Sequence, residues 1–133
     1  MPEQLTRSTG EKERHAGTII CPVDFSEASY NSVQFSLDIC QMMSARLLVL
    51  HVYESPVHFT TARFARAEDI RLYKEAAEQM ESFVEKLSRM PAISKVNVEG
   101  QLKSGVPSAS TLEVAESLSA ELIVMAASSA DQA

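Results

Sequence analysis

Two short apolar runs, at residues 18–23 and 47–52, constrain the fold of this chain more than any other feature. Both consist mainly of β-branched and aliphatic residues, and neither alternates apolar with polar positions. Such runs are typical of strands that are buried on both faces, as in parallel sheets covered by helices on each side. Pro22 cannot donate a ladder hydrogen bond, so we expect it at the carboxyl end of the first strand, where pairing stops.

The segment between these two runs has the pattern of an amphipathic helix over residues 27–44. Ser26 is a favourable N-cap residue, and Val33, Leu37 and Cys40 recur at helical spacing. A second apolar row beside them contains Phe35, Ile39 and Met43. The order strand, helix, strand therefore predicts a βαβ unit with a right-handed crossover.

The rest of the chain continues the alternation of helices and strands. We expect a loop at residues 54–66, a helix over 67–90, an edge strand over 95–102, a helix that begins at Pro107 and a strand over 122–125. The expected apolar rows of the two helices are Ile70, Tyr73, Ala77, Met80, Val84 and Leu87, and then Leu112, Ala115 and Leu118. This order predicts an α/β fold with an open, mostly parallel, twisted sheet of four recognisable strands.

A length of 133 residues is enough for one domain with its own core. Residues 1–17 are polar and show no apolar periodicity, so we expect a flexible arm there. The remaining residues, 18–133, are expected to form a single domain.

Composition and charge exclude several classes of protein. The chain has 18 acidic against 12 basic residues, a net charge of −6, which argues against nucleic acid and anionic membranes as partners. No run approaches the roughly 20 apolar residues that span a bilayer, and the N-terminus lacks the apolar core of a secretory signal. We therefore expect an intracellular, soluble protein. Cys21 and Cys40 are too few for a disulfide framework and are expected to be buried free thiols.

The carboxyl ends of the expected strands are the places where a ligand would bind in an open parallel sheet. Asp24 is the carboxylate that directly follows a buried strand. It could accept hydrogen bonds from a base or a ribose hydroxyl, or it could instead cap the following turn through its own backbone. Its position in the sequence favours neither interpretation. His51 is expected to be a hydrogen-bonded residue of a buried strand, and Arg63, Arg66 and Arg71 a solvated surface group.

Several segments, in order and at the right spacing, resemble the universal stress protein (UspA-like) family. They are Ile19 to Ala28, Val49 to Val52, Gly105-Val106-Pro107, Ala115, and Ala120 to Met125. The resemblance implies a three-layer α/β sandwich of the adenine-nucleotide α-hydrolase-like type with five strands. It further implies a cytoplasmic homodimer that is linked to stress responses.

The resemblance also implies a binding site for an adenine nucleotide. By position, adenine and ribose would contact Pro22, Val23, Asp24 and Val52. Nucleotide-binding members grip the phosphates with a glycine motif directly after the fourth strand, where this chain has Met125 and Ala126. Glycines there form an anion-binding concavity from backbone N–H groups. Ala126 and Ser129 replace the first two glycines, and the later Gly-Ser pair has no counterpart before Ala133.

These features predict a regulatory or interaction domain of the stress response that binds ATP or AMP weakly or not at all. The alternative is an ATP- or AMP-binding switch, or a slow ATPase, whose phosphate site a partner or a further C-terminal segment completes. An enzyme is less favoured because the sequence offers no convincing base, metal ligand or phosphate clamp. A phosphorylated signalling receiver fits less well, because no later strand ends in an aspartate. Since the family's fifth strand has no counterpart here, we expect residues 122–125 to pair across a homodimer, or else the chain to be truncated and partly unstable.

Overall fold

The computed structural model of the chain describes residues 17–55 and 63–127. The predicted polar arm lies outside the described residues except for Gly17, whose carbonyl accepts a hydrogen bond of 3.0 Å from the Arg46 N–H. Ser129 and the rest of the C-terminal segment after Ala127 also lie outside them.

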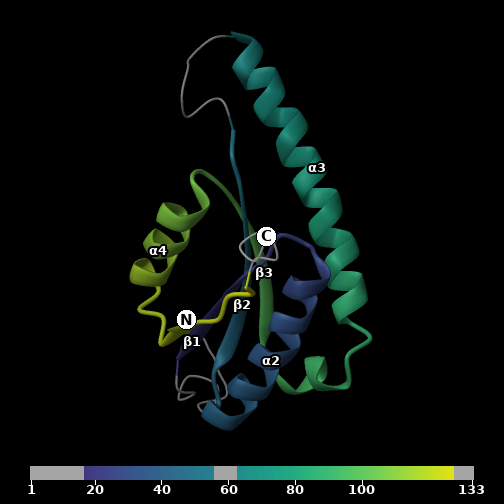
Figure 1. The fold of residues 1–133 in the computed structure, drawn as a ribbon, viewed down its shortest axis with the longest axis vertical. Helices are drawn as coiled ribbons and strands as arrows, with labels where there is room; N and C mark the ends of the chain where they lie inside the picture. Colours follow the sequence, from purple (N-terminus) through teal and green to yellow (C-terminus); the bar gives the residue numbers. More distant parts are fainter. Residues whose placement is uncertain (1–16, 56–62, 128–133) are drawn as a thin grey trace, which may run out of the picture.

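The described strands form one parallel sheet in the order β3-β2-β1-β4 (Figure 1). The strands are β1 (Thr18–Pro22), β2 (Arg46–Tyr53), β3 (Val98–Ser104) and β4 (Leu122–Ile123). The predicted open α/β sheet with four parallel strands is confirmed. Pro22 is the last residue of β1, and β3 is an edge strand, as the sequence predicts. This edge strand begins at Val98 rather than residue 95, because Pro91–Lys95 forms the short 3₁₀ helix η2.

Helices cover both faces of the sheet and complete three layers (Figure 1). Helices α2 (Glu27–Met43) and α3 (Arg63–Leu87) lie on one face, and α4 (Pro107–Ser117) lies on the other. Ile19 and Val49 face α2 and α3, whereas Ile20 and Leu48 face α4. These strand residues are at most 2% exposed, and each such side chain stabilises the fold by about 1.5–3 kcal/mol through burial.

The helix α2 confirms the predicted cap, one predicted apolar row, and Ile39 and Met43 of the other row, which are partly buried against the core. The Ser26 hydroxyl accepts a hydrogen bond from the Ser29 N–H at 3.2 Å, and the helix ends at Ser44 in the left-handed conformation. Val33, Leu37 and Cys40 are buried as predicted. The prediction for Phe35 is wrong, since its side chain is 59% exposed. The small residues Ser32 and Ser36 are buried against the sheet in its place, which lets the helix lie close to the strands.

The long helix α3 differs most from its prediction. It begins at Arg63 rather than residue 67 and ends at Leu87 rather than Met90. Its buried residues are Ala65, Ala76, Met80, Phe83 and Leu87. Of the predicted row, Met80 and Leu87 are buried as expected, whereas Ile70, Tyr73 and Val84 are about half exposed. The helix carries two neighbouring apolar rows, and packing against β2 and β3 covers only the row that includes Phe83.

The helix α4 begins at Pro107, as predicted, but its buried row lies one residue earlier in the chain than the predicted row. Thr111 and Val114 are buried, whereas Leu112 is 59% exposed. The chain enters this helix through Gly105, whose φ of +154° suits glycine. A Cβ atom there would come 2.2 Å from the Ser110 hydroxyl, so the turn into α4 requires this glycine.

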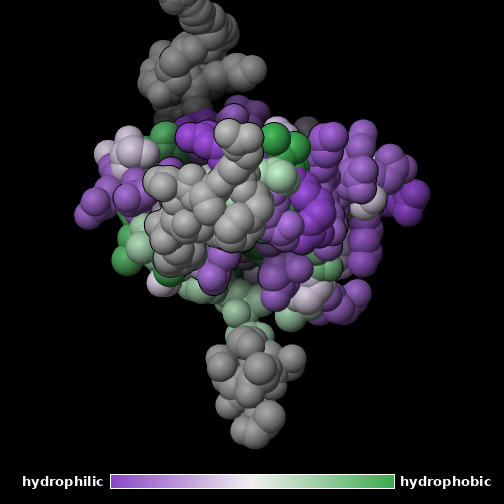
Figure 2. Space-filling model, turned by 90° about the horizontal axis from the view of Figure 1, so that it is seen from above, coloured by the Kyte–Doolittle hydropathy of each residue, from purple (hydrophilic) through white to green (hydrophobic). Residues whose placement is uncertain are grey.

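The surface of the described residues is mixed in character. Seen from above, it is mostly hydrophilic, and its hydrophobic residues lie in separate small groups (Figure 2). Among the helices within residues 17–55 and 63–127, none combines the length and apolar character that crossing a bilayer requires.

Candidate functional site

A cavity of about 570 Å³ lies at the carboxyl ends of β1, β2 and β4. The strand order reverses at β1, because β2 pairs on one side of it and β4 on the other. Open parallel sheets bind their ligands at such a reversal point. The volume falls in the range of pockets that hold small ligands and cofactors.

All six residues that the sequence predicts for the site line this one cavity: Pro22, Val23, Asp24, Val52, Met125 and Ala126. They come from three strand ends that are far apart in the sequence. Whether they bind a ligand stays a prediction. The cavity also has walls that the sequence reasoning missed, from Ser29 in α2 and Thr111 in α4. The wall from α4 could have been predicted from Pro107, which marks the start of a helix directly after a strand. The first turn of such a helix lies at the carboxyl end of the sheet, where the cavity is.

The Asp24 carboxylate serves as a cap in the structure. Its Oδ1 atom accepts hydrogen bonds from the Ser26 N–H at 3.0 Å and from the Ser29 hydroxyl at 2.7 Å. Hydrogen bonds from Ser26 and Ser29 lower the pKa of Asp24 below its ordinary value, because they stabilise the charged form. One oxygen therefore holds the turn, and none of the described residues donates a hydrogen bond to the other, Oδ2.

His51 lies on β2 and lines the same cavity. Its Nδ1 atom lies 2.7 Å from the carbonyl oxygen of Val23, which confirms the predicted hydrogen-bonded histidine. The Phe25 ring packs on the imidazole with ring centroids 4.3 Å apart, and it also meets Phe83 at 5.6 Å. Phe25 has a φ of +68°, an unfavourable conformation that these ring contacts hold in place.

The charged residues of the cavity wall are acidic. Asp24 and Glu27 line it, and no lysine or arginine does so within the described part of the chain. Hydroxyl groups of Ser26, Ser29 and Thr111 are its neutral polar groups. A cationic clamp for phosphate is thus not present among these lining residues.

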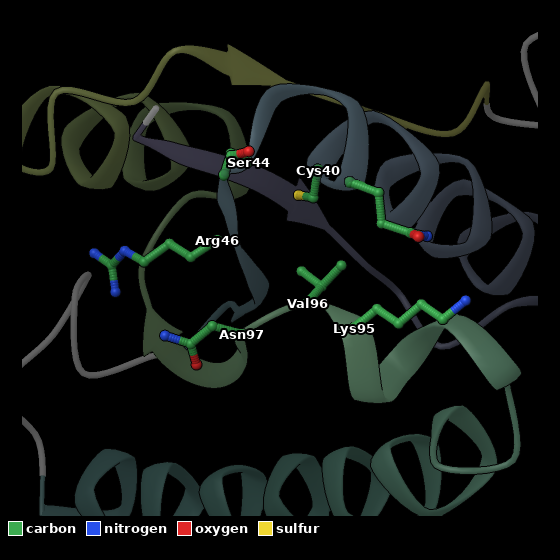
Figure 3. Close-up of a pocket in the computed structure, with 8 residues that line it drawn as sticks. Cys40, Ser44, Arg46, Lys95, Val96 and Asn97 are labelled. Carbon is green, nitrogen blue, oxygen red and sulfur yellow. The ribbon is translucent and has the colours of Figure 1, made fainter. Parts of the chain in front are cut away.

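A second cavity, of about 410 Å³, lies at the opposite, amino end of the strands (Figure 3). Its wall contains Cys40, Arg46 and Lys95, but the two basic side chains point away from each other (Figure 3). Arg46 donates from Nε to the Thr18 hydroxyl at 2.8 Å and forms an ion pair with Glu99 at 3.6 Å. The basic groups there do not converge on a ligand.

The two cysteines are buried and unpaired, as the sequence predicts. Burial and, to a smaller extent, the neighbouring Cys21 raise the pKa of Cys40 to about 11. Burial also raises the pKa of Cys21, whose sulfur lies 3.4 Å from the Ser32 hydroxyl. Neither thiol has the lowered pKa of a reactive cysteine.

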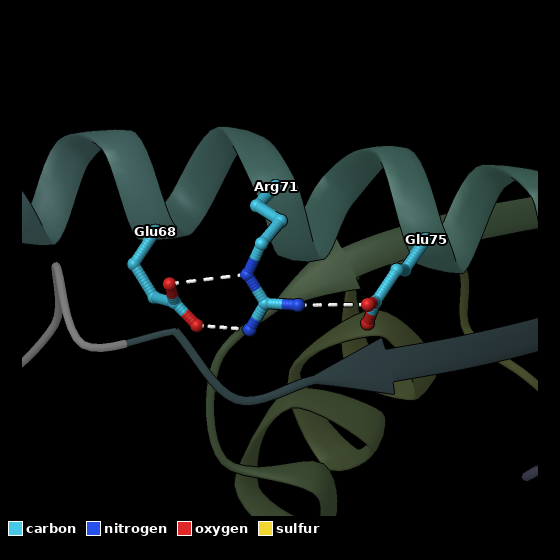
Figure 4. A network of polar contacts seen from close by, with 3 residues as sticks. All are labelled: Glu68, Arg71 and Glu75. Atoms are coloured by element: carbon cyan, nitrogen blue, oxygen red, sulfur yellow. Dashed lines mark hydrogen bonds and ion pairs between the residues drawn. The ribbon is translucent and has the colours of Figure 1, made fainter.

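Arg71, near the start of α3, is not a free cation. Arg71 is held between Glu68 and Glu75 of the same helix, with a hydrogen bond of 2.7 Å to the Glu75 carboxylate (Figure 4). The hydrogen bonds that Arg71 donates to Glu68 lower the pKa of Glu68. Across the described residues, no group of three or more histidines, cysteines or carboxylates could hold a metal ion.

Comparisons with known proteins agree on one family. The family model of the universal stress proteins matches residues 16–132. No match was found among curated protein sequences.

Solved structures with a similar fold include the hypothetical protein MJ0577, with 21% identity, a TM-score of 0.66, and coverage of 84% of this chain and 74% of that one. A universal stress family protein from Burkholderia pseudomallei has 17% identity, a TM-score of 0.64, and coverage of 90% and 87%. UspA from Lactobacillus plantarum has 23% identity, a TM-score of 0.54, and coverage of 82% and 75%. At these identities the similarity demonstrates a shared fold.

Proposed function

We propose that this chain, which belongs to the universal stress protein family, is a regulatory domain that binds the nucleoside part of an adenine nucleotide weakly. The observation that carries this proposal is the cavity at the carboxyl ends of β1, β2 and β4. It gathers every predicted contact residue, and its described wall includes no cation. We infer a binding module of the stress response rather than an enzyme.

The backbone of Val52 supplies the edge that would read the base. Along a strand, the N–H and C=O groups of alternate residues point to the same side. The Leu50 carbonyl accepts from the Val23 N–H on the β1 side, and the Tyr53 carbonyl accepts from the Gly105 N–H on the β3 side. Val52 therefore faces the β1 side, beyond the last paired residue of β1, with one donor and one acceptor. This pair complements the ring nitrogen N1 and the 6-amino group of adenine.

The ribose would lie near Asp24. Its Oδ2 atom can accept hydrogen bonds from the two ribose hydroxyls while Oδ1 continues to hold Ser26 and Ser29. Because the carboxylate is charged at neutral pH, these bonds would be stronger than bonds to a neutral acceptor.

The phosphates would gain little from this cavity. Ala126 occupies the position of the family's first phosphate glycine, and Asp24 and Glu27 repel an anion. We therefore expect adenosine, AMP and ATP to bind with similar affinities.

Isothermal titration of the full 133-residue chain with adenosine, AMP and ATP tests this proposal. We expect dissociation constants weaker than about 10 μM that agree within about threefold, since the phosphates add no net interaction. No detectable adenosine binding would overturn the proposal. A dissociation constant for ATP below about 1 μM would also overturn it and would favour a switch with a complete phosphate site.

We also propose that β4 pairs across a homodimer. The strand lies at the edge of the sheet, and among the described residues no other strand pairs with its outer side. Leu122 is 40% and Met125 is 67% exposed, so pairing would bury apolar side chains as well as backbone groups. Sedimentation at several concentrations should show a dimer that Leu122→Lys weakens. Leu112→Lys, at an equally apolar exposed position on α4, should leave it intact. A monomer at all concentrations would contradict this proposal.

A further inference from the structure

The parallel ladder between β1 and β2 ends one hydrogen bond earlier than a regular ladder over the same residues would. The last pair in register is Pro22 with Leu50, and the Val23 N–H still donates to the Leu50 carbonyl at 2.8 Å. The next bond of a parallel ladder would run from the Val52 N–H to the Val23 carbonyl. No such bond occurs among the described residues.

The Val23 carbonyl is instead occupied by a side chain. The His51 ring nitrogen Nδ1 lies 2.7 Å from the Val23 oxygen. A carbonyl can only accept a hydrogen bond, so Nδ1 must carry the proton. The imidazole has thus replaced the backbone N–H that would ordinarily bond this carbonyl.

Packing holds the imidazole in this position. The Phe25 ring lies 4.3 Å from the His51 ring between centroids, and Phe83 contacts Phe25 from the side at 5.6 Å. The chain between Val23 and Phe25 is therefore fixed at both ends, by a hydrogen bond from His51 and by a ring contact with it. This arrangement keeps the carbonyl of Val23 turned toward the imidazole.

We propose that His51 is a positioning residue that prepares the Val52 backbone to bind a 6-aminopurine. By occupying the Val23 carbonyl, it keeps the Val52 N–H unpaired within the cavity and leaves its donor and acceptor side by side. A 6-oxopurine presents the reverse order, a donor at N1 and an acceptor at O6. In the same position its N1–H would face the Val52 N–H, and its O6 would face the Val52 carbonyl. This inference rests on the proposed nucleoside binding for its ligand but not for the state of the Val52 amide.

Amide hydrogen exchange, followed by NMR on the full-length chain, tests the inference without any ligand. His51→Phe keeps a ring against Phe25 and removes the donor, so the Val23 carbonyl becomes free to accept from Val52. We expect the Val52 amide to exchange rapidly in the wild-type chain and at least about tenfold more slowly in His51→Phe. His51→Asn places an amide donor near the position of Nδ1 and should restore rapid exchange. Equal exchange in the wild-type chain and His51→Phe would overturn the inference, as would a Val52 amide already protected in the wild-type chain.

Titration with adenosine and inosine measures the preference between the two nucleosides, which would not change if His51 only stabilised the fold. We expect the wild-type chain to prefer adenosine, and His51→Phe to lose at least about fivefold of that preference while its thermal stability stays close to that of the wild-type chain. His51→Asn should recover most of the preference. An unchanged preference in His51→Phe would contradict the positioning role.

The two proposals fail in distinguishable ways. If the wild-type chain binds no adenosine but His51→Phe slows exchange at Val52, nucleoside binding is refuted and the role of His51 at the backbone stands. If adenosine binds but exchange at Val52 does not respond to His51, the binding proposal stands and the positioning role is refuted.

Discussion

The two ends of the sheet differ in how the backbone is used, although each carries a cavity. At the amino end the backbone groups near the cavity are paired within the fold. The Ala45 N–H donates to Cys40, that of Arg46 to Gly17, and that of Leu47 to the Asn97 carbonyl at 2.9 Å. At the carboxyl end, a side chain occupies the Val23 carbonyl, and Val52 lines the cavity.

This difference shows that cavity volume alone does not identify a binding site. The cavity at the amino end has two basic side chains, yet these diverge and one of them is already paired. The cavity at the carboxyl end is lined by residues from three strand ends, because the strand order reverses there. Four experiments test the proposed difference between the two ends, and those with the largest expected effects come first.

The first experiment concerns the thiol of Cys40 at the amino end. With its pKa raised to about 11, Cys40 should react with a thiol reagent at pH 8 at least about 100-fold more slowly in the native than in the unfolded chain. Cys21→Ala isolates the signal, and Gln41→Cys introduces an exposed thiol on the same cavity wall as a rapid control. Equal rates in the native and unfolded chains would mean that the Cys40 thiol is accessible to the reagent in the native chain and would contradict its burial.

The second experiment removes the carboxylate at the opposite end. Asp24→Ala should lower the affinity for adenosine by at least about tenfold, because a charged acceptor for the ribose is lost. Arg46→Ala, at the amino end, should leave that affinity within about twofold of the wild type. Isothermal titration measures both. An unchanged affinity in Asp24→Ala would exclude any role of Asp24 in binding.

The third experiment tests whether Arg46 is structural. Arg46→Ala removes the bond to the Thr18 hydroxyl, so the free energy of unfolding in urea should fall by about 0.5–1.5 kcal/mol. Arg89→Ala breaks an exposed ion pair with Glu85 and should cost at most about 0.5 kcal/mol. A larger loss for Arg89→Ala than for Arg46→Ala would contradict this assignment.

The fourth and smallest effect is the pH dependence that Asp24 contributes. Its pKa is lower in the folded than in the unfolded chain, so its contribution to stability is present at neutral pH. That contribution is lost as the pH falls below the ordinary value of an aspartate and through the lower folded value. Asp24→Asn keeps an oxygen acceptor for Ser26 and Ser29 without a charge.

Urea unfolding at pH 7 and pH 3 should therefore show a slightly smaller loss of stability for Asp24→Asn than for the wild type. The effect is small because Asp24 is exposed to solvent, which screens its interactions. An equal or larger loss in Asp24→Asn would indicate that the hydrogen bonds do not favour the charged form.

Local patterns predicted most of the elements and failed where two apolar rows competed. Residues 18–23 and 47–52 became β1 and β2 because continuous apolar runs can be buried only inside a covered sheet. Ser26 became a cap because its hydroxyl needs only the neighbouring turn. In α3, both Tyr73 and Phe83 belong to apolar rows at helical spacing, and only Phe83 is buried.

The candidate site was predicted in part. Asp24 and Ala126 follow strands and Val52 lies near the end of β2, so their common position at one edge was expected and is observed. The wall formed by Thr111 was not predicted, because it depends on how α4 lies across the sheet. The hydrogen bond from His51 to Val23 could also not be predicted from local sequence patterns, since it joins residues 28 positions apart.

The alternation of strands and helices and the residues at the strand ends could be predicted from the sequence alone, because hydrophobic periodicity and capping act over one or two turns of the chain. The family was indicated by ordered sequence motifs rather than by periodicity. The tertiary structure was needed to show which helix rows are buried, which residues line each cavity, and that an imidazole takes the place of a ladder N–H. These depend on distances between segments that are far apart in the chain, which no local pattern specifies.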